Sequence, residues 1–481
     1  MVNDTDVLIV GAGPTGLTLG IDLARRGVPA QVVERADGLF PGSRGKGLQP
    51  RTMEIFDDLG VYDAIRAAGG TYPAGMIWQD GERVGEHRMF DPVGADENSP
   101  YTEPCMIPQW RTQRILLERL EELGGKVAFG RKVTGLTQDE EGVTARLTSG
   151  DTVRARYTVA ADGGRSTVRR AVGIAMTGEQ LDPGPMLVAD VRITGLDRDN
   201  WHIFPPRDGG GDDGDGAGGD ILAICPLAGT EDFQLTTRFA HGTEVDLSLD
   251  GIRRVVAARS HLAPDDVTEV RWASDFRPRA ALADRFRAGR VFLAGDAAHV
   301  HSPAGGQGLN TSVQDAHNLG WKLGAVLRDG AGAPLLDTYE EERRPIAAQM
   351  LSLSTSVHRG ETRRGAATRQ LGLGYPASSL TRETRTAPGP LRAGDRAPDA
   401  TVDGVRLFDA FRGPHWTLLA LGVPAPGTEV PVRVVRGPAH QSYGTGLFLV
   451  RPDGYVGWAG DTAAAGLPEY LTRFGPRRPP A

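Results

Sequence analysis

The chain has 481 residues, a formal net charge of −7 at pH 7 and two cysteines, Cys105 and Cys225. This length allows two or three domains, while the acidic charge argues against a nucleic-acid partner and two cysteines provide neither a disulfide framework nor metal-ligand spacing. No apolar run reaches the roughly 18 residues of a membrane span and no signal sequence precedes the first strand, so we expect a cytoplasmic protein with no metal and no membrane partner.

The first predicted unit is a strand, a tight turn and a helix. Residues 6–10 are apolar apart from Asp6, residues 11–16 follow the pattern G-x-G-x-x-G, and residues 17–26 read as a helix. In this pattern the first glycine makes the turn, the second lets the backbone approach a pyrophosphate, and the third lets helix and strand pack closely. The unit therefore predicts a dinucleotide-binding site.

A second strand is predicted at residues 30–34, and it places Glu34 where an acidic residue accepts from adenosine ribose hydroxyls. An acid at this position suits the free 2′-hydroxyl of FAD. The glycine pattern also occurs twice within residues 209–219, but without a strand before it or a helix after it, and among aspartates that would repel phosphate. We interpret residues 208–220 as a flexible, low-complexity loop.

Two further turns follow apolar strands. Residues 159–169 deliver Asp162 to a turn before a short helix, and residues 292–310 run through Gly295 and Asp296 into a glycine-rich turn that opens a longer helix. The first turn of such a helix has unpaired N–H donors and a partial positive charge. An aspartate at a strand end can accept from a polyol hydroxyl while these amides hold an electron-rich ring edge, and flavin is the ligand that needs both.

Together, G-x-G-x-x-G, Asp162-Gly163 and Gly295-Asp296, in this order, resemble the group A flavoprotein monooxygenases, the aromatic hydroxylases typified by p-hydroxybenzoate hydroxylase and phenol hydroxylase. Within the family, the sequence is most similar to actinobacterial aromatic polyketide hydroxylases and rifampicin-type monooxygenases. The resemblance implies an α/β fold in which a Rossmann-like FAD-binding domain carries an inserted antiparallel-sheet substrate domain. It also implies a C-terminal thioredoxin-like domain, which here lacks Cys-x-x-Cys.

The resemblance and the alternating apolar pattern of segments such as residues 233–239 set the expected domain boundaries. We expect an FAD-binding domain at 1–73, 104–182 and 277–385, a substrate domain at 74–103 and 183–276, and the thioredoxin-like domain at 390–481.

The resemblance further implies which residues contact the cofactor. Arg44 and Lys46 match basic residues that reach the phosphates and flavin, and Gln109 matches a glutamine at the ribityl or phosphate region. Asp296 is expected to be buried against the ribityl chain and Glu34 to lie nearer solvent. The candidate cofactor-binding residues are Gly11, Gly13, Thr15, Gly16, Glu34, Arg35, Arg44, Lys46, Gln109, Val133, Asp162, Asp296, Gly308, Leu309 and Asn310.

Pro303 and Arg44 are the catalytic candidates that the resemblance implies. Pro303 matches the proline beside the flavin. Arg44 has a second expected role with nicotinamide, since members of the family bind nicotinamide without a second Rossmann fold, and the absence of another credible dinucleotide motif fits this. No side-chain base is identifiable. We interpret His299 and His301, which adjoin the flavin motif, as histidines that bond to backbone and fix the turn.

The reaction implied by the resemblance uses FAD as cofactor and NADPH as co-substrate. Reduced FAD and O₂ form a flavin hydroperoxide, which passes one oxygen atom to a bulky, polyketide-type aromatic substrate. We expect a monomer or homodimer. Antibiotic inactivation, Baeyer–Villiger oxidation of a polycyclic ketone, halogenation, suggested by residues 201–206, and an aromatic-antibiotic binding protein without turnover are the alternatives.

Overall fold

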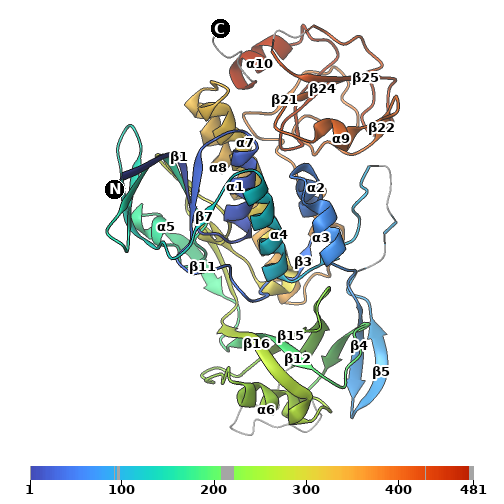
Figure 1. Cartoon of the computed structure of the whole chain (residues 1–481). Helices are drawn as coiled ribbons and strands as arrows, with labels where there is room; N and C mark the ends of the chain where they lie inside the picture. Colours follow the sequence, from blue (N-terminus) through green and yellow to red (C-terminus); the bar gives the residue numbers. More distant parts are fainter. Residues whose placement is uncertain (1, 91–92, 95–97, 207–220, 428–429, 476–481) are drawn as a thin grey trace.

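The structure is a computed structural model that describes residues 2–90, 93–94, 98–206, 221–427 and 430–475. The loop expected at 208–220 lies outside these residues. Figure 1 shows three parts along one long axis. A Rossmann-like domain lies in the middle, with an inserted sheet at one end and a C-terminal domain at the other. None of the described helices combines the length and hydropathy that a membrane span requires.

The Rossmann-like domain is built on a sheet with the order β18-β19-β10-β1-β2-β7, extended by β9 and β8. The central pairs, β10 with β1, β1 with β2 and β10 with β19, are parallel. Parallel strands that are buried on both faces have continuous apolar sequences, and the end of β1 has one, the buried run of residues 7–10. The strands are β1 (Val2–Val10), β2 (Ala30–Val33), β7 (Val127–Ala128), β8 (Val133–Gln138), β9 (Val143–Leu147), β10 (Thr152–Ala160), β18 (Arg287–Ala288) and β19 (Val291–Leu293).

Helices α1, α4 and α7 pack together beside this sheet. The helix α7 is buried nearly all round, because α1, α8 and the C-terminal domain surround it. The helices of this domain are α1 (Pro14–Ala24), α2 (Pro50–Asp58), α3 (Tyr62–Ala68), α4 (Gln109–Glu122), α5 (Thr167–Ala171), α7 (Gly308–Leu327) and α8 (Asp337–His358). Short strands complete it: β3 (Gly47–Leu48), β6 (Cys105–Met106), β11 (Met176–Gln180), β17 (Arg279–Ala283) and β20 (His299–Val300).

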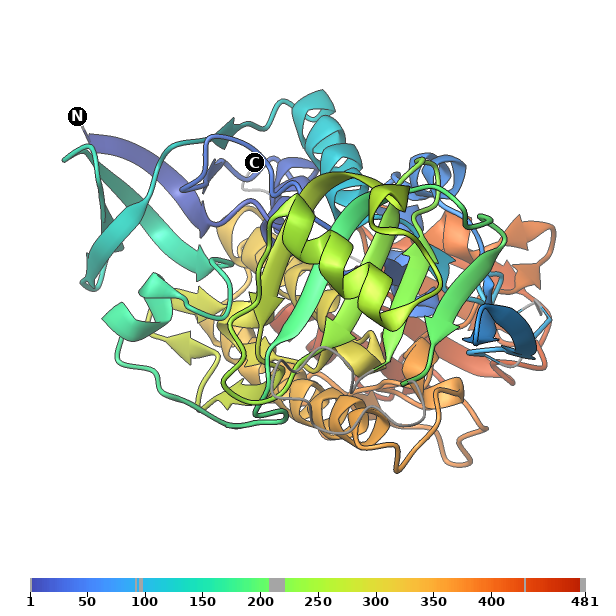
Figure 2. The same ribbon diagram turned by 90° about the horizontal axis from the view of Figure 1, so that it is seen from below.

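The inserted sheet has the order β16-β12-β15-β14-β13-β4-β5, and α6 (Leu249–Arg259) covers one face. Figure 2 shows this helix across the outer side of the sheet. All neighbours are antiparallel except β4 and β13, which are parallel. These two strands come from different inserts, so no hairpin imposes an antiparallel pairing. The strands are β4 (Ala74–Gln79), β5 (Glu82–His87), β12 (Met186–Ile193), β13 (Asn200–Phe204), β14 (Leu222–Pro226), β15 (Phe233–Arg238) and β16 (Val267–Phe276).

The C-terminal domain contains a mixed sheet with the order β21-β27-β26-β24-β25 and apolar clusters on both faces. One cluster includes Trp321 of α7, whose ring lies 5.6 Å from that of Trp416, so this core continues into the Rossmann-like domain. The elements are β21 (Arg382–Glu383), β22 (Thr401–Val402), β23 (Val405–Arg406), α9 (Leu407–Phe411), β24 (Thr417–Leu421), β25 (Arg433–Gly437), β26 (Gly446–Val450), β27 (Val456–Gly460) and α10 (Leu467–Phe474). The α/β class is confirmed, and the thioredoxin-like character of this domain stays a prediction.

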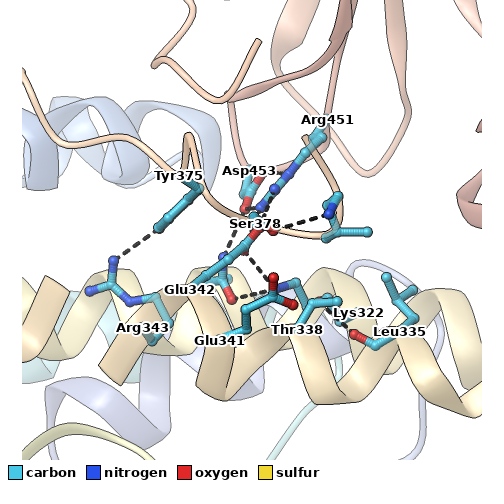
Figure 3. A network of polar contacts seen from close by, with 12 residues as sticks. Lys322, Leu335, Thr338, Glu341, Glu342, Arg343, Tyr375, Ser378, Arg451 and Asp453 are labelled. Carbon is cyan, nitrogen blue, oxygen red and sulfur yellow. Dashed lines mark hydrogen bonds and ion pairs between the residues drawn. The ribbon is translucent and has the colours of Figure 1, made fainter. Parts of the chain in front are cut away.

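A buried network of charges joins the C-terminal domain to α7 and α8 (Figure 3). The carboxylate of Glu342 accepts from Lys322 at 2.7 Å and from Arg451 at 2.9 Å, and Arg451 also pairs with Asp453. All four side chains are buried. Two cations and two anions balance each other, which is the condition under which charges are tolerated in a protein interior.

Candidate functional site

The glycine-rich turn after β1 has the geometry that its sequence predicts. Gly11 has a φ of +110°, and a Cβ there would collide with the carbonyl oxygen of Ala161, while a Cβ on Gly16 would collide with the carbonyl oxygen of Gly11. Around Gly13, a Cβ would meet nothing within 4 Å. The chain itself thus requires the first and third glycines, whereas the second leaves exposed backbone that a phosphate can approach.

Glu34 holds this turn against the end of β2. Its carboxylate accepts from the backbone N–H of Ala12 at 2.9 Å and from that of Ala36 at 3.0 Å. The backbone N–H of Arg131 donates to the carbonyl of Glu34 at 2.8 Å, so the segment that leads into β8, which begins at Val133, runs beside it. Each carboxylate oxygen of Glu34 keeps a free lone pair, so the residue can still accept from a ribose hydroxyl.

Asp162 lies against the same turn, and one of its two carboxylate oxygens is available for a ligand. Its Oδ2 accepts from the backbone N–H groups of Thr167 at 2.7 Å and Val168 at 3.2 Å, at the start of α5. Its Oδ1 is buried and has no hydrogen-bond partner within the described ranges. A buried acceptor without a donor is unusual, and a ligand hydroxyl would satisfy it.

The segment of residues 292–310 adjoins the glycine-rich turn of residues 11–16 at Thr15. Gly295 has a φ of +62°, and a Cβ added to it would lie only 2.5 Å from the Thr15 hydroxyl oxygen. The next residue, Asp296, sits in a turn at the end of β19 with its side chain exposed, whereas Glu34 is half-buried. The burial of Asp296 against the ribityl chain, which the sequence analysis expects, concerns the FAD-bound protein and stays a prediction.

Charged groups from two distant segments surround Asp296. Desolvation by the surrounding protein raises the pKa of Asp296, while the charges of His299 and Arg44 lower it. Desolvation lowers the pKa of Arg44, which lies near two further cations, Arg165 and Arg35, and 5.1 Å from the ring of Phe40. Arg44 and Asp296, far apart in sequence, thus lie within electrostatic range of each other, and both are exposed.

Asn310 joins the segment around residues 45–49 to the start of α7. Its side-chain oxygen accepts from the backbone N–H of Gln49 at 2.7 Å, and its amide nitrogen donates to the carbonyl of Gly47 at 3.0 Å. The Gly45 backbone N–H donates to the Gln109 side chain at 3.0 Å, and Gly45 also packs against Leu309. Gln109, Leu309 and Asn310 are therefore brought together around one segment of backbone.

The side chain of Lys46 contacts the inserted sheet. Its ammonium donates to Gln234 of β15 at 2.7 Å and lies 4.1 Å from the ring centroid of Trp201 on β13. The side chain is therefore at the junction with the inserted sheet, where Gln234 offers an acceptor and Trp201 a π face. The contact with cofactor phosphates expected for Lys46 stays a prediction.

His299 and His301 belong to a buried chain of polar groups. The His299 ring bonds to Asp315 at 2.6 Å and to the His301 ring at 2.9 Å. Asp315 also accepts from the backbone N–H of Gly295 at 3.1 Å and from Arg343 at 2.8 Å. His299 thus supports the turn through Asp315, while His301 also bonds to the backbone of Met350.

Asp315 and Arg343 are the site residues that sequence reasoning missed. Neither residue carries a sequence signal, because Asp315 is one of many polar residues on α7. Pro303 is exposed at the start of a short turn before α7, and Gly308 is the first residue of that helix. Among the described residues, no group of three or more His, Cys, Asp or Glu could hold a metal ion.

The residues present fit a flavin dinucleotide. Gly13 offers open backbone for phosphate, Asp162 and Asp296 offer free carboxylate oxygens for hydroxyls, and the start of α7 offers unpaired N–H groups beside Arg44. These features come from three segments far apart in the chain, and the contacts described above bring them together.

Comparisons with known proteins agree. Residues 4–354 match the FAD binding domain family, and residues 391–476 match the aromatic-ring hydroxylase C-terminal domain. A flavin-dependent monooxygenase from Mycobacteroides abscessus is 45% identical over 97% of this chain and 99% of its own length. Rifampicin monooxygenase from Rhodococcus hoagii is 33% identical over 98% of each chain.

A solved structure shows the same likeness. The ternary complex of aklavinone-11 hydroxylase with FAD and aklavinone has a TM-score of 0.80 to this chain at 28% identity, and the match covers 98% of this chain and 99% of that one. The resemblance expected from the sequence motifs is therefore confirmed. The chain belongs to the flavin-dependent aromatic-ring monooxygenases and carries their FAD binding domain.

Proposed function

We propose that the protein is an NADPH-consuming monooxygenase that inserts one oxygen atom from O₂ into a bulky, polyketide-type aromatic substrate through a flavin hydroperoxide. The observation that carries this proposal is the approach of Arg44 and Asp296 beside the open start of α7. Relatives named for rifampicin and aklavinone, both large molecules, support the size of the substrate. FAD, when bound, supplies the redox and oxygen chemistry.

The chain's own residues would hold and orient the reactants. We assign the pyrophosphate to the turn at Gly11, Gly13, Thr15 and Gly16 and the ribityl chain to Asp296 and Asp162. The N–H groups at the start of α7 would favour negative charge on the reduced ring, a contribution of about 0.3 to 2 kcal/mol. We assign Arg44 to the nicotinamide cofactor and Pro303 to the ring's edge. The domain boundaries drawn from the sequence stand as part of this proposal.

The test is coupled consumption of cofactor and oxygen. Purified protein reconstituted with FAD is incubated with NADPH and a panel of anthraquinone, angucycline and rifamycin compounds under ¹⁸O₂. We expect one compound to stimulate NADPH oxidation and to gain one ¹⁸O atom by mass spectrometry. Tight binding of these compounds without NADPH consumption would instead establish a binding protein without turnover.

Antibiotic inactivation is the second candidate, and the rifampicin monooxygenase relative favours it. In that case a rifamycin would be the compound that stimulates NADPH oxidation. The masses and fragment spectra of the products also separate hydroxylation from Baeyer–Villiger oxidation, since only the latter inserts oxygen between two carbon atoms of a ketone.

A further inference from the structure

Gln370 is a buried residue in a left-handed backbone conformation. Its φ is +62° and its ψ is +14°, at the end of the short 3₁₀ helix Ala366–Arg369, and only 1% of it is exposed. Among the described residues, the other non-glycine residues with a positive φ are Asp80 and Asp403. Both are exposed aspartates that precede a glycine in the tight turn of a hairpin. That turn type explains the two aspartates but not Gln370.

Glycine is the residue that this backbone position favours. A helix commonly ends at a left-handed residue, and glycine adopts that conformation without the collision that an L side chain suffers. Strained residues of this kind persist where the surrounding structure holds them, and they cluster at functional sites. The group that Gln370 has and a glycine would lack is the side-chain amide. The contacts of that amide should therefore explain why glutamine stands here.

The amide of Gln370 clamps the first two turns of α7. Its nitrogen donates to the side-chain oxygen of Gln307 at 2.7 Å and to the hydroxyl of Thr311 at 3.2 Å. Its oxygen accepts from the side-chain amide of Gln314 at 2.5 Å. Residues 307, 311 and 314 are spaced by four and three, so they share one face of the helix, and all three side chains are buried. Gln370 therefore uses both its donors and its acceptor on this face.

Gln307 connects this clamp to the turn that precedes α7. It is the N-cap residue of the helix, and its side-chain amide donates to the carbonyl of Gly305 at 2.8 Å and to that of Thr368 at 3.3 Å. Gly305 ends the short turn that begins at Pro303. The turn, the start of α7 and the segment around Gln370 are therefore one hydrogen-bonded unit.

The unit lies between a fixed support and the place assigned to the flavin ring. Gly308 and Leu309 follow Gln307 directly and are partly exposed, and the Gln307 side chain does not cap the N–H groups of this first turn. On the support side, the carbonyl of Leu371 accepts from Arg396 of the C-terminal domain at 3.0 Å, and Arg396 also pairs with Glu54 of α2 at 2.8 Å. Gln370 thus joins this support to the N–H groups that are available to a ligand.

We propose that Gln370 is a positioning residue for the flavin. Through Gln307 it holds the turn from Pro303 to Leu309 so that the N–H groups of Gly308 and Leu309 face the ring. This inference rests on the proposed function, which puts the ring at the start of α7. N–H groups that are fixed in advance stabilise the negative charge of the reduced ring without a cost of reorganisation. Without the clamp, reduced FAD should lose more affinity than oxidised FAD, and the midpoint potential should fall.

The test measures the midpoint potential of FAD bound to Gln370→Gly. Glycine adopts the left-handed conformation freely, so this variant removes the amide without straining the backbone. We expect the preference for reduced over oxidised FAD to fall about tenfold, which lowers the potential of a two-electron couple by about 30 mV. The affinity for oxidised FAD and the urea unfolding of the FAD-free protein should change little. Slow anaerobic reduction beside a reference dye gives the potential, and flavin fluorescence gives the affinity.

Two further variants make the result specific. Asp403→Gly relieves a left-handed residue on the exposed surface of the C-terminal domain and should keep the wild-type potential. Gln307→Ala should lower the potential, and adding Gln370→Gly to it should lower the potential no further, because both act on one turn.

The proposal fails alone if Gln307→Ala lowers the potential and Gln370→Gly does not, if the two effects add, or if Gln370→Gly loses oxidised FAD. An unchanged potential in both variants would overturn the place assigned to the flavin ring as well. NADPH, O₂ and aromatic substrate are absent throughout, so these outcomes are separate from failure of the monooxygenase assay.

Discussion

The side chain of Asn310 and the backbone of Gln49 are joined by a hydrogen bond of 2.7 Å across 261 positions of sequence. We predict that Asn310→Ala weakens FAD binding about tenfold, because loss of this bond frees the segment around Gly47 from the start of α7. Quenching of flavin fluorescence on titration measures the change. Asn200→Ala, on the inserted sheet, is the matched control and should leave FAD affinity intact, whereas equal loss in both variants would contradict the prediction.

Asp296→Ala is predicted to remove most of the bound FAD, and Glu34→Ala to remove less. Asp296 is exposed and free to accept from the ribityl chain, whereas Glu34 already accepts from two backbone N–H groups and shares its capacity. The flavin absorbance per protein after purification gives the answer. An Asp296→Ala protein that purifies fully yellow would show that the end of β19 is wrongly placed in the site.

Arg44→Ala is predicted to slow reduction of FAD by NADPH at least tenfold while FAD content changes little. The Arg44 guanidinium is exposed near Asp296. Together with the nearby cations Arg165 and Arg35, it can bind the phosphates of a second cofactor. Anaerobic stopped-flow reduction measures the rate. Arg66→Ala, an exposed arginine on α3, serves as control, and unchanged reduction in Arg44→Ala would remove its nicotinamide role.

Acid is predicted to destabilise the protein through His301. Burial, and then the neighbouring His299, lower the pKa of His301 to about 3 from 6.5. The unfolded chain therefore binds more protons between these values, so the stability is complete above pH 6.5 and falls by up to about 1.4 kcal/mol per pH unit as the pH is lowered toward 3.

Urea unfolding near pH 7 and near pH 5 measures this dependence. His301→Gln should reduce the acid-induced loss of stability, since the titrating ring is gone. The exposed His241 offers a matched control, and His241→Gln should retain the full pH dependence. An unchanged slope in His301→Gln would show that other groups account for it.

Glu342→Gln is predicted to destabilise the attachment of the C-terminal domain by about 3 to 5 kcal/mol, because Lys322 and Arg451 would lose their shared carboxylate in a buried place. Burial raises the pKa of Glu342, but the charges of Arg451 and Lys322 lower it by more, so this pKa lies below its usual range. Thermal unfolding and limited proteolysis between α8 and β22 report the change. Glu118→Gln, an exposed glutamate on α4, is the control and should show neither effect.

The sequence identifies those parts of the site that depend on local backbone geometry. Gly11 and Gly16 are dictated by collisions within a few residues or with the adjacent strand, so their spacing carries a clear signal. Asp315 and Arg343 carry none, because their significance comes from partners on distant elements. The side chain of Lys46 shows the same limit, since a basic residue beside a flavin motif can equally turn toward a neighbouring sheet.

The position of β1 in its sheet bears on how the protein is made. This strand lies between β2 and β10, and β10 pairs on its other side with β19, which begins only at Val291. During synthesis, strands β12 to β16 of the inserted sheet are all made between β10 and its last neighbour, β19. A nascent chain stopped before Val291 would expose an apolar parallel edge, and we expect such fragments to require chaperones or to aggregate.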